Sequence, residues 1–120
     1  MAGGFTISHD EELERAFDVW VLVRKTLGVQ AFGINMVELP PSASIPEHDE
    51  TARDQEELFF VVAGSPTLVV DGVEHPLRAG SFARLEPELV RTVRNDGGET
   101  ARVLIVSAPT TSGYEPMDWA

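Results

Sequence analysis

The sequence predicts an all-β protein, in which short antiparallel strands pack as a sandwich or small barrel and are preceded by a short helical segment. From residue 30 onward, runs of strand length recur at intervals of roughly ten residues, with turn-forming residues between them. Asp71-Gly72 stands between β-branched residues, which is the strongest short-range signal for a β-hairpin. The chain has 120 residues and a hydrophobic fraction of 42%, which fits one soluble domain.

The first 28 residues carry helical signals. Ser8 and Glu11 have the spacing of a capping box, and the apolar residues that follow recur at i, i+3, i+4 and i+7, namely Leu13, Ala16, Phe17 and Trp20. We therefore expect an amphipathic helix from about His9 to Phe17. Gly28 is a candidate C-cap, so helix could also extend to Leu27. The residues between, VWVLV, fit a strand equally well, and the sequence leaves both alternatives open.

The strands follow in order along the rest of the chain. Expected strand segments share β-branched or aromatic content and bounding turn residues, and they lie at 30–39, 58–63, 67–77 (a hairpin), 81–86, 90–95 and 101–108. PPSASIP after the first strand is a loop, because proline cannot donate to a sheet ladder. We assign one domain to residues 1–120, with an N-terminal segment at 1–28, a β-barrel at 30–108 and a C-terminal tail at 109–120.

The charge of the chain bears on its partners. With 20 acidic against 9 basic residues, the formal net charge is −11, which repels phosphate backbones and anionic lipid. We therefore expect neither a nucleic-acid nor a membrane partner. The chain has no cysteine, so no disulfide, thiolate metal site or thiol nucleophile is available. The N-terminus has neither the basic nor the apolar region of a signal peptide, and we expect a cytoplasmic protein.

The stretch PEHDETARDQEELFFVVAG, residues 46–64, is similar to the first motif of the cupin superfamily, G-x5-H-x-H-x3,4-E-x6-G. His48 matches the first histidine, and Glu57 with Gly64 matches E-x6-G without a gap. The second histidine position falls on Glu50. The second motif, G-x5-P-x-G-x2-H-x3-N, is matched in register at its ends, by Gly80 and Asn95, and its histidine position is Arg91.

This resemblance covers about residues 30 to 108 and is greatest to small single-domain bacterial cupins. It implies a jelly-roll β-barrel of two packed antiparallel sheets, a pocket for a small molecule inside the barrel, and a homodimer, for which VWVLV is a candidate surface. It also implies one divalent transition metal, which cupins hold with three histidines and one glutamate. Here the ligands would be His48, Glu57 and Glu50, because Arg91 cannot ligate a cation.

A second interpretation needs no metal. Side chains alternate along a strand, so Glu57 and Phe59 share one face, and the cupin register also points Arg91 into the barrel. Arg91 could then bind the carboxylate or enol oxygen of an organic acid, with His48 placed for proton transfer. The expected pocket therefore comprises His48, Glu50, Glu57, Phe59 and Arg91, and His48 and Arg91 are the candidate catalytic residues.

Each of these residues also has a purely structural interpretation. His48 could be a solvated loop residue, Glu57 an exposed edge residue, and Arg91 part of a solvent-facing row of arginines. No nucleophile elbow, phosphate-binding glycine loop or H-E-x-x-H pair is present in the sequence. Three classes of function remain: a metal-free binding protein or acid–base enzyme, a metal-dependent dioxygenase-like or isomerase-like enzyme, and a non-catalytic cupin with a filled pocket. The residues favour the first, leave the reaction and the cofactor undetermined, and do not decide whether the protein is an enzyme.

Overall fold

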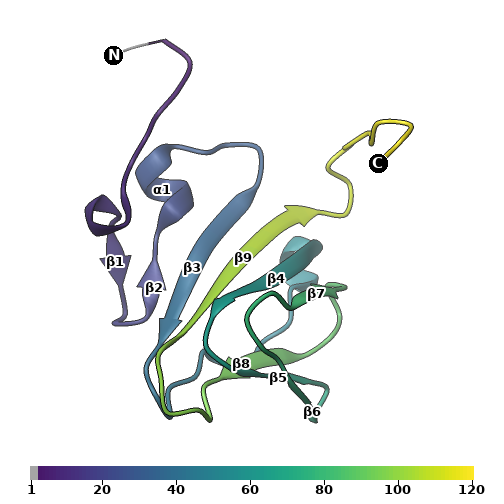
Figure 1. Ribbon diagram of the computed structural model, residues 1–120. Helices are drawn as coiled ribbons and strands as arrows, with labels where there is room; N and C mark the ends of the chain where they lie inside the picture. Colours follow the sequence, from purple (N-terminus) through teal and green to yellow (C-terminus); the bar gives the residue numbers. More distant parts are fainter. Residues whose placement is uncertain (1–2) are drawn as a thin grey trace.

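Two antiparallel sheets that pack face to face make up most of the structure, a computed structural model that describes residues 3–120 (Figure 1). The large sheet has the order β1-β2-β3-β9-β4-β7, with bounds Arg15–Ala16, Trp20–Val21, Gly33–Leu39, Ala101–Pro109, Gln55–Ala63 and Phe82–Leu85. The small sheet has the order β6-β5-β8, with bounds Val73–Pro76, Thr67–Val70 and Arg91–Arg94. Within the described range, three short helices complete the fold: η1 (Asp10–Glu12), α1 (Val23–Leu27) and η2 (Thr51–Arg53). The all-β prediction is confirmed, and Met1 and Ala2 of the predicted domain lie outside the described residues.

The core lies between the inner faces of the two sheets. Alternate residues of the long strands point inward, as in β9, where Ala101, Val103 and Ile105 are buried and the residues between them are only partly buried. From the small sheet, Leu68 and Val93 pack into the same hydrophobic cluster. Burial of these apolar faces is the main stabilisation of the fold.

The loop before β4 extends the small sheet irregularly. The His48 amide donates to the Arg91 carbonyl at 3.0 Å, and the Arg91 amide donates to the His48 carbonyl at 2.8 Å. A second isolated bridge joins Ser44 to Arg94. Proline in this loop lacks the N–H that a continuous ladder needs, so the pairing stays intermittent. The result is that His48 lies beside the first residue of β8.

Two turns show why glycine stands at particular positions. Asp71 and Gly72 both have positive φ, 47° and 80°, and join β5 to β6 in the predicted hairpin. Gly64 ends β4 with a φ of 83°, and a Cβ atom there would lie 2.7 Å from the Ala101 Cα atom. The glycine of the first motif is therefore required by both backbone conformation and space.

The predicted helix from His9 to Phe17 is wrong. Within the described residues this segment forms only the single turn η1, and Arg15–Ala16 then pairs with Trp20–Val21 as a hairpin on the edge of the large sheet. The same apolar spacing fits a helix and this hairpin, and pairing of β2 with β3 stabilises the strand. The helix lies further on, as α1, and Gly28 with φ of 77° is its C-cap as predicted.

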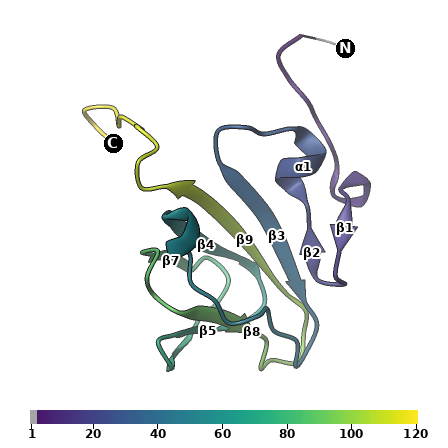
Figure 2. The same cartoon turned by 180° about the vertical axis from the view of Figure 1, so that it is seen from behind.

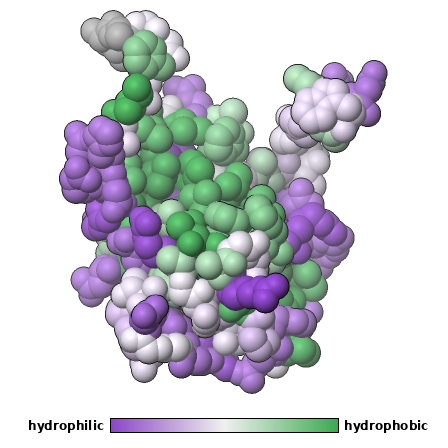
Figure 3. Space-filling view, in the orientation of Figure 1, coloured by the Kyte–Doolittle hydropathy of each residue, from purple (hydrophilic) through white to green (hydrophobic). Residues whose placement is uncertain are grey.

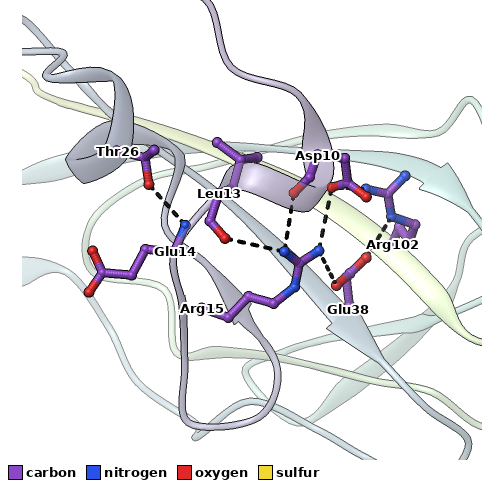
Figure 4. A network of polar contacts seen from close by, with 7 residues as sticks. All are labelled: Asp10, Leu13, Glu14, Arg15, Thr26, Glu38 and Arg102. Carbon is purple, nitrogen blue, oxygen red and sulfur yellow. Dashed lines mark hydrogen bonds and ion pairs between the residues drawn. The ribbon is translucent and has the colours of Figure 1, made fainter.

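A network of ion pairs fastens the N-terminal segment to the large sheet (Figure 4). Arg15 donates to Glu38 of β3 at 3.2 Å and to the Asp10 carbonyl at 3.1 Å. Arg102 of β9 donates to Glu38 at 3.1 Å and to the Asp10 carboxylate at 3.2 Å. The amide of Glu14 donates to the Thr26 hydroxyl at 3.1 Å, which ties β1 to α1.

The two ends of the chain project from the same end of the barrel, as Figures 1 and 2 show. Within the described residues, no helix is both long enough and apolar enough to cross a membrane.

Candidate functional site

Three side chains with metal-ligating atoms meet at the wall of the barrel. His48 and Glu50 come from the loop before β4, and Glu57 comes from β4 itself. One ligand atom from each lies within 4.8 Å of the other two. The His48 Nε2 atom is 3.3 Å from Glu50 Oε2 and 3.9 Å from Glu57 Oε1. Strand alternation brings Glu57 inward, and the backbone pairing of His48 with Arg91 places the imidazole opposite it.

The proton position on His48 follows from one contact. Its Nδ1 atom lies 2.9 Å from the Pro46 carbonyl oxygen. A carbonyl oxygen only accepts, so Nδ1 carries a hydrogen and donates it. Nε2 is thereby directed toward the two carboxylates. A histidine whose other ring nitrogen donates to a backbone carbonyl is the usual arrangement at metal sites.

Glu57 is a buried carboxylate whose charge is only partly compensated. Its side chain is largely buried, and Oε1 has no hydrogen-bond partner among residues 3–120. Burial raises the pKa of Glu57 above its ordinary value of 4.5, and the nearby Glu50 raises it further, while Arg91 and His48 oppose the shift. The Arg91 Nε atom, also without a hydrogen-bond partner in that range, lies 3.5 Å from Glu57 Oε1.

Arg91 is not placed to bind a ligand in the barrel. Its side chain is fully buried, with 0% exposed, and it does not line the cavity next to Glu57. Its Nη2 atom donates to the Glu86 carbonyl at 2.9 Å, and Nη1 donates to the Pro87 carbonyl at 3.4 Å. The guanidinium therefore fixes the loop before β8 and lies behind Glu57.

A cavity of about 910 Å³ is lined by all three of these residues, His48, Glu50 and Glu57. Asp18, Asn35, Ser44 and Ser107 add polar groups to its wall, and the remaining wall residues are apolar. The volume lies at the upper end of the range for small-molecule sites. The cavity is therefore not filled by side chains.

The structure places the other predicted residues as follows. Phe59 is buried in the hydrophobic core and does not line the cavity. Asn95 of the second motif is buried, and its amide nitrogen donates to the carbonyls of Leu39 at 2.8 Å and Glu99 at 2.6 Å, so its role here is structural. The alternative that Arg91 belongs to a solvent-facing row of arginines is wrong, because its side chain is fully buried. The nearby Arg94 and Arg102 do pair with acidic residues near the surface.

Sequence reasoning missed the contribution of the N-terminal hairpin. Four consecutive residues, Phe17 to Trp20, line the cavity. Of these, Val19 and Trp20 also pack against the hydrophobic core. The strand alternative for VWVLV could have indicated these four residues, because a strand at that position extends the large sheet past the pocket.

The family of the chain follows from these observations together. Two antiparallel sheets around a cavity, with a histidine and carboxylates on its wall, define a small β-barrel of the jelly-roll type. A cupin-domain family model matches residues 35–107, more than half of the chain. The chain therefore belongs to the cupin superfamily, which confirms the resemblance.

Solved structures with the same fold differ widely in sequence. A cupin protein from Bacteroides fragilis is 19% identical, with 94% of each chain covered and a TM-score of 0.74. A sugar phosphate isomerase of the cupin superfamily from Silicibacter pomeroyi is 26% identical over 78% of this chain and 61% of that one, with a TM-score of 0.66. A protein described as a predicted oxalate decarboxylase from Thermotoga maritima is 16% identical over 87% and 99%, with a TM-score of 0.72. No curated protein matches the chain.

Proposed function

We propose that the protein binds one divalent transition metal ion with His48, Glu50 and Glu57 and a small organic molecule in the cavity beside it. The observation that carries the proposal is the orphaned Glu57 Oε1 atom, which lies in a cluster whose three ligand atoms are within 4.8 Å of one another. A buried carboxylate oxygen without a partner is costly, and a bound cation is one partner that would satisfy it.

The donor set indicates which ions fit. One imidazole nitrogen and two carboxylate oxygens form a harder set than three histidines and one carboxylate. Imidazole and carboxylate ligands suit Mn²⁺, Fe²⁺ and Zn²⁺, and because intrinsic affinity rises toward Cu²⁺, metal availability would decide which ion is bound. A dipositive ion would also balance the negative charges of Glu50 and Glu57. When bound, the ion would supply a Lewis acid that attracts a carboxylate, enol or hydroxyl oxygen of the ligand.

The other residues define what the site does with a ligand. Arg91 holds Glu57 in position from behind, and the Pro46 carbonyl fixes the imidazole ring of His48. Asn35 and Ser107 offer hydrogen bonds from the wall, and apolar wall residues such as Ile34 and Ile105 offer contacts to the carbon skeleton of a ligand. An organic acid remains the first ligand class to test, with the metal rather than Arg91 as its positive partner. Because one structural neighbour is a sugar phosphate isomerase, a sugar phosphate belongs in the same screen.

A metal-free acid–base site is the second candidate. The 3.3 Å distance between His48 Nε2 and Glu50 Oε2 suits a protonated imidazole that donates to the carboxylate. In that case His48 would transfer a proton to or from a ligand in the cavity. This alternative predicts ligand binding without metal.

The deciding experiment is metal analysis by mass spectrometry on untagged protein purified without chelator, with thermal shifts on addition of Mn²⁺, Fe²⁺ and Zn²⁺. We expect near-stoichiometric metal in the wild type and loss of both the metal and the thermal shift in His48→Ala. His75→Ala is the matched control, because His75 lies exposed on β6 and outside the cluster. Absence of metal and of any metal-induced shift in the wild type would refute the metal proposal.

A further inference from the structure

The tip of the N-terminal hairpin has an unusual backbone. Phe17 and Asp18, between β1 and β2, both adopt left-handed conformations with φ of 52° and 66°. Asp tolerates this region better than most residues, but for a bulky residue such as Phe it is rare. The Phe17 side chain is 88% exposed, and it lines the cavity that holds His48, Glu50 and Glu57.

Folding of the chain does not explain this phenylalanine. A left-handed conformation is unfavourable for an L-residue, and a ring that stays in water recovers almost none of that free energy by burial. Glycine would adopt the same turn without the penalty. A ring in this position can stabilise a state in which something else covers it, and the cavity that it lines is where a ligand would do so.

The hairpin presents this wall in a fixed position. Trp20, which also lines the cavity, pairs with Ala16 on one side and with Val37 of β3 on the other. At the base of the hairpin, Arg15 is ion-paired to Glu38. The hairpin therefore lies on one side of the barrel, outside residues 35–107, the part of the chain that the family model matches.

We propose that Phe17 and Trp20 form a subsite for a flat aromatic ring of the ligand, whose oxygen-bearing end lies at His48, Glu50 and Glu57. The inference rests on the proposed function and specifies its ligand class as an aryl-substituted hydroxy or carboxylic acid. The wall of the cavity carries the carboxylates of Asp18, Glu50 and Glu57 and no lysine or arginine from the described residues. An anionic ligand therefore needs the metal to compensate its negative charge, whereas an uncharged aryl compound can bind without the metal.

Two probe pairs separate the ring from the oxygen-bearing end. 3-Phenyllactate and lactate differ only by a phenyl ring, and they test binding to the metal-loaded protein by calorimetry. 2-Phenylethanol and ethanol are uncharged, and they test the ring alone in metal-free protein through Trp20 fluorescence. The Trp119→Phe background leaves Trp20 as the single tryptophan reporter, because the chain has two tryptophans.

We expect each phenyl compound to bind at least tenfold more tightly than its partner. Phe17→Gly should weaken binding of both phenyl compounds by roughly fivefold, the effect of one aromatic contact, and should leave lactate binding unchanged. Since glycine fits the turn, Tm should stay the same or rise. Phe32→Ala, at an exposed phenylalanine before β3 that does not line the cavity, should change no affinity.

Two results would overturn the subsite. One is equal binding of each phenyl compound and its partner, and the other is unchanged phenyl affinity in Phe17→Gly, which together with a lowered Tm would show a structural role. Failure of the metal proposal looks different: the protein would lack metal and would not bind lactate, but 2-phenylethanol would still quench Trp20. Stoichiometric metal without phenyl selectivity would leave the proposed function standing and remove the subsite.

Discussion

The Arg91 Nε atom lies 3.5 Å from Glu57 Oε1, and this pair joins the two sheets beside the cavity. Arg91 begins β8 of the small sheet, and Glu57 lies on β4 of the large one. The arginine is fully buried and donates to two backbone carbonyls, while the glutamate faces the cavity. A buried charge thus supports the carboxylate that we assign to metal binding.

Removal of Arg91 should destabilise the protein strongly. Arg91→Ala leaves the buried Glu57 carboxylate without its nearest cation and frees the carbonyls of Glu86 and Pro87, so we expect a loss of about 3–5 kcal/mol in the free energy of unfolding. Urea denaturation monitored by circular dichroism measures it. The double variant Arg91→Ala/Glu57→Gln should lose less than the two single variants together. Strict additivity in this cycle would contradict the coupling.

The stability of the protein should depend on pH through Glu57. Because burial raises the pKa of Glu57 in the folded state, folding favours its protonated form. The contribution of this group to stability is therefore full below the ordinary value of 4.5 and is lost as pH rises from there through the raised pKa. Urea titrations at several pH values should show the wild type losing stability relative to Glu57→Gln over that window. A constant difference between the two proteins would contradict the pKa shift.

Metal binding should show the opposite dependence on pH. A cation needs the deprotonated carboxylate, so affinity for Mn²⁺ should rise as pH increases through the raised pKa of Glu57. Calorimetric titration with Mn²⁺ from pH 5 upward would measure this, with Glu56→Gln as control, since Glu56 lies on the exposed side of β4 and pairs with Arg84. An affinity for Mn²⁺ that stays flat across the window would place the ion elsewhere.

Asn95 should be essential to the fold rather than to the site. Its side chain donates to the carbonyls of Leu39 and Glu99, and its Oδ1 atom accepts from the Gly97 amide at 2.9 Å. Asn95→Ala leaves several buried polar groups unpaired, each worth about 1–3 kcal/mol, so we expect a loss of about 2–4 kcal/mol. Asn35→Ala, at a cavity-wall residue, is the comparison. A similar Tm decrease for the two variants would contradict this division of roles.

The outer face of the large sheet should bind a second copy of the chain. Apolar residues are cross-strand neighbours on this face, namely Leu58, Phe60, Phe82, Leu104 and Val106. The ring centroids of Phe60 and Phe82 lie 4.5 Å apart. Figure 3 shows hydrophobic side chains gathered between the two projecting chain ends. Those ends carry further exposed rings on Phe5, Tyr114 and Trp119. With Phe82 they expose on the order of 600 Å² of aromatic surface, close to the roughly 800 Å² that each partner buries in a stable dimer.

Light scattering after size-exclusion chromatography tests this dimer. We expect a dimer for the wild type and a monomer for Phe82→Asp, because a carboxylate in the centre of an apolar interface would be buried without a partner. Val73→Asp is the matched control, since Val73 is 58% exposed but lies on β6 of the other sheet. A monomeric wild type at micromolar concentration would disprove the assignment.

Much of the fold could be predicted from local patterns. The Asp71-Gly72 turn and the alternating strands were predictable, because turn conformation and the two-residue period of side chains depend on residues that are close in sequence. The N-terminal hairpin could not be predicted in this way. Leu13, Ala16 and Phe17 have helical spacing, and the strand forms because β3 offers an edge to pair with, which is a tertiary effect.

The candidate site was predictable in its members but not in their roles. Motif register alone indicated His48, Glu50 and Glu57 as one group, and their binding of metal stays a prediction. The Arg91 guanidinium is oriented by two backbone carbonyls in a loop, and the positions of backbone carbonyls cannot be read from the identities of the residues. The contribution of Phe17 depends on a turn conformation that a phenylalanine rarely adopts.

The four hairpin residues on the cavity wall are contiguous in the chain, and none is a member of the buried core cluster. This arrangement matters for engineering of the cavity. Residues 17–20 form a short segment that can be varied as a unit, in which Val19 and Trp20 also pack against the core. A library that varies them alone could change which molecules enter without touching His48, Glu50 or Glu57. A chain shortened to begin at residue 35, where the family match starts, would lose this segment, so we expect its ligand profile to differ from that of the full chain.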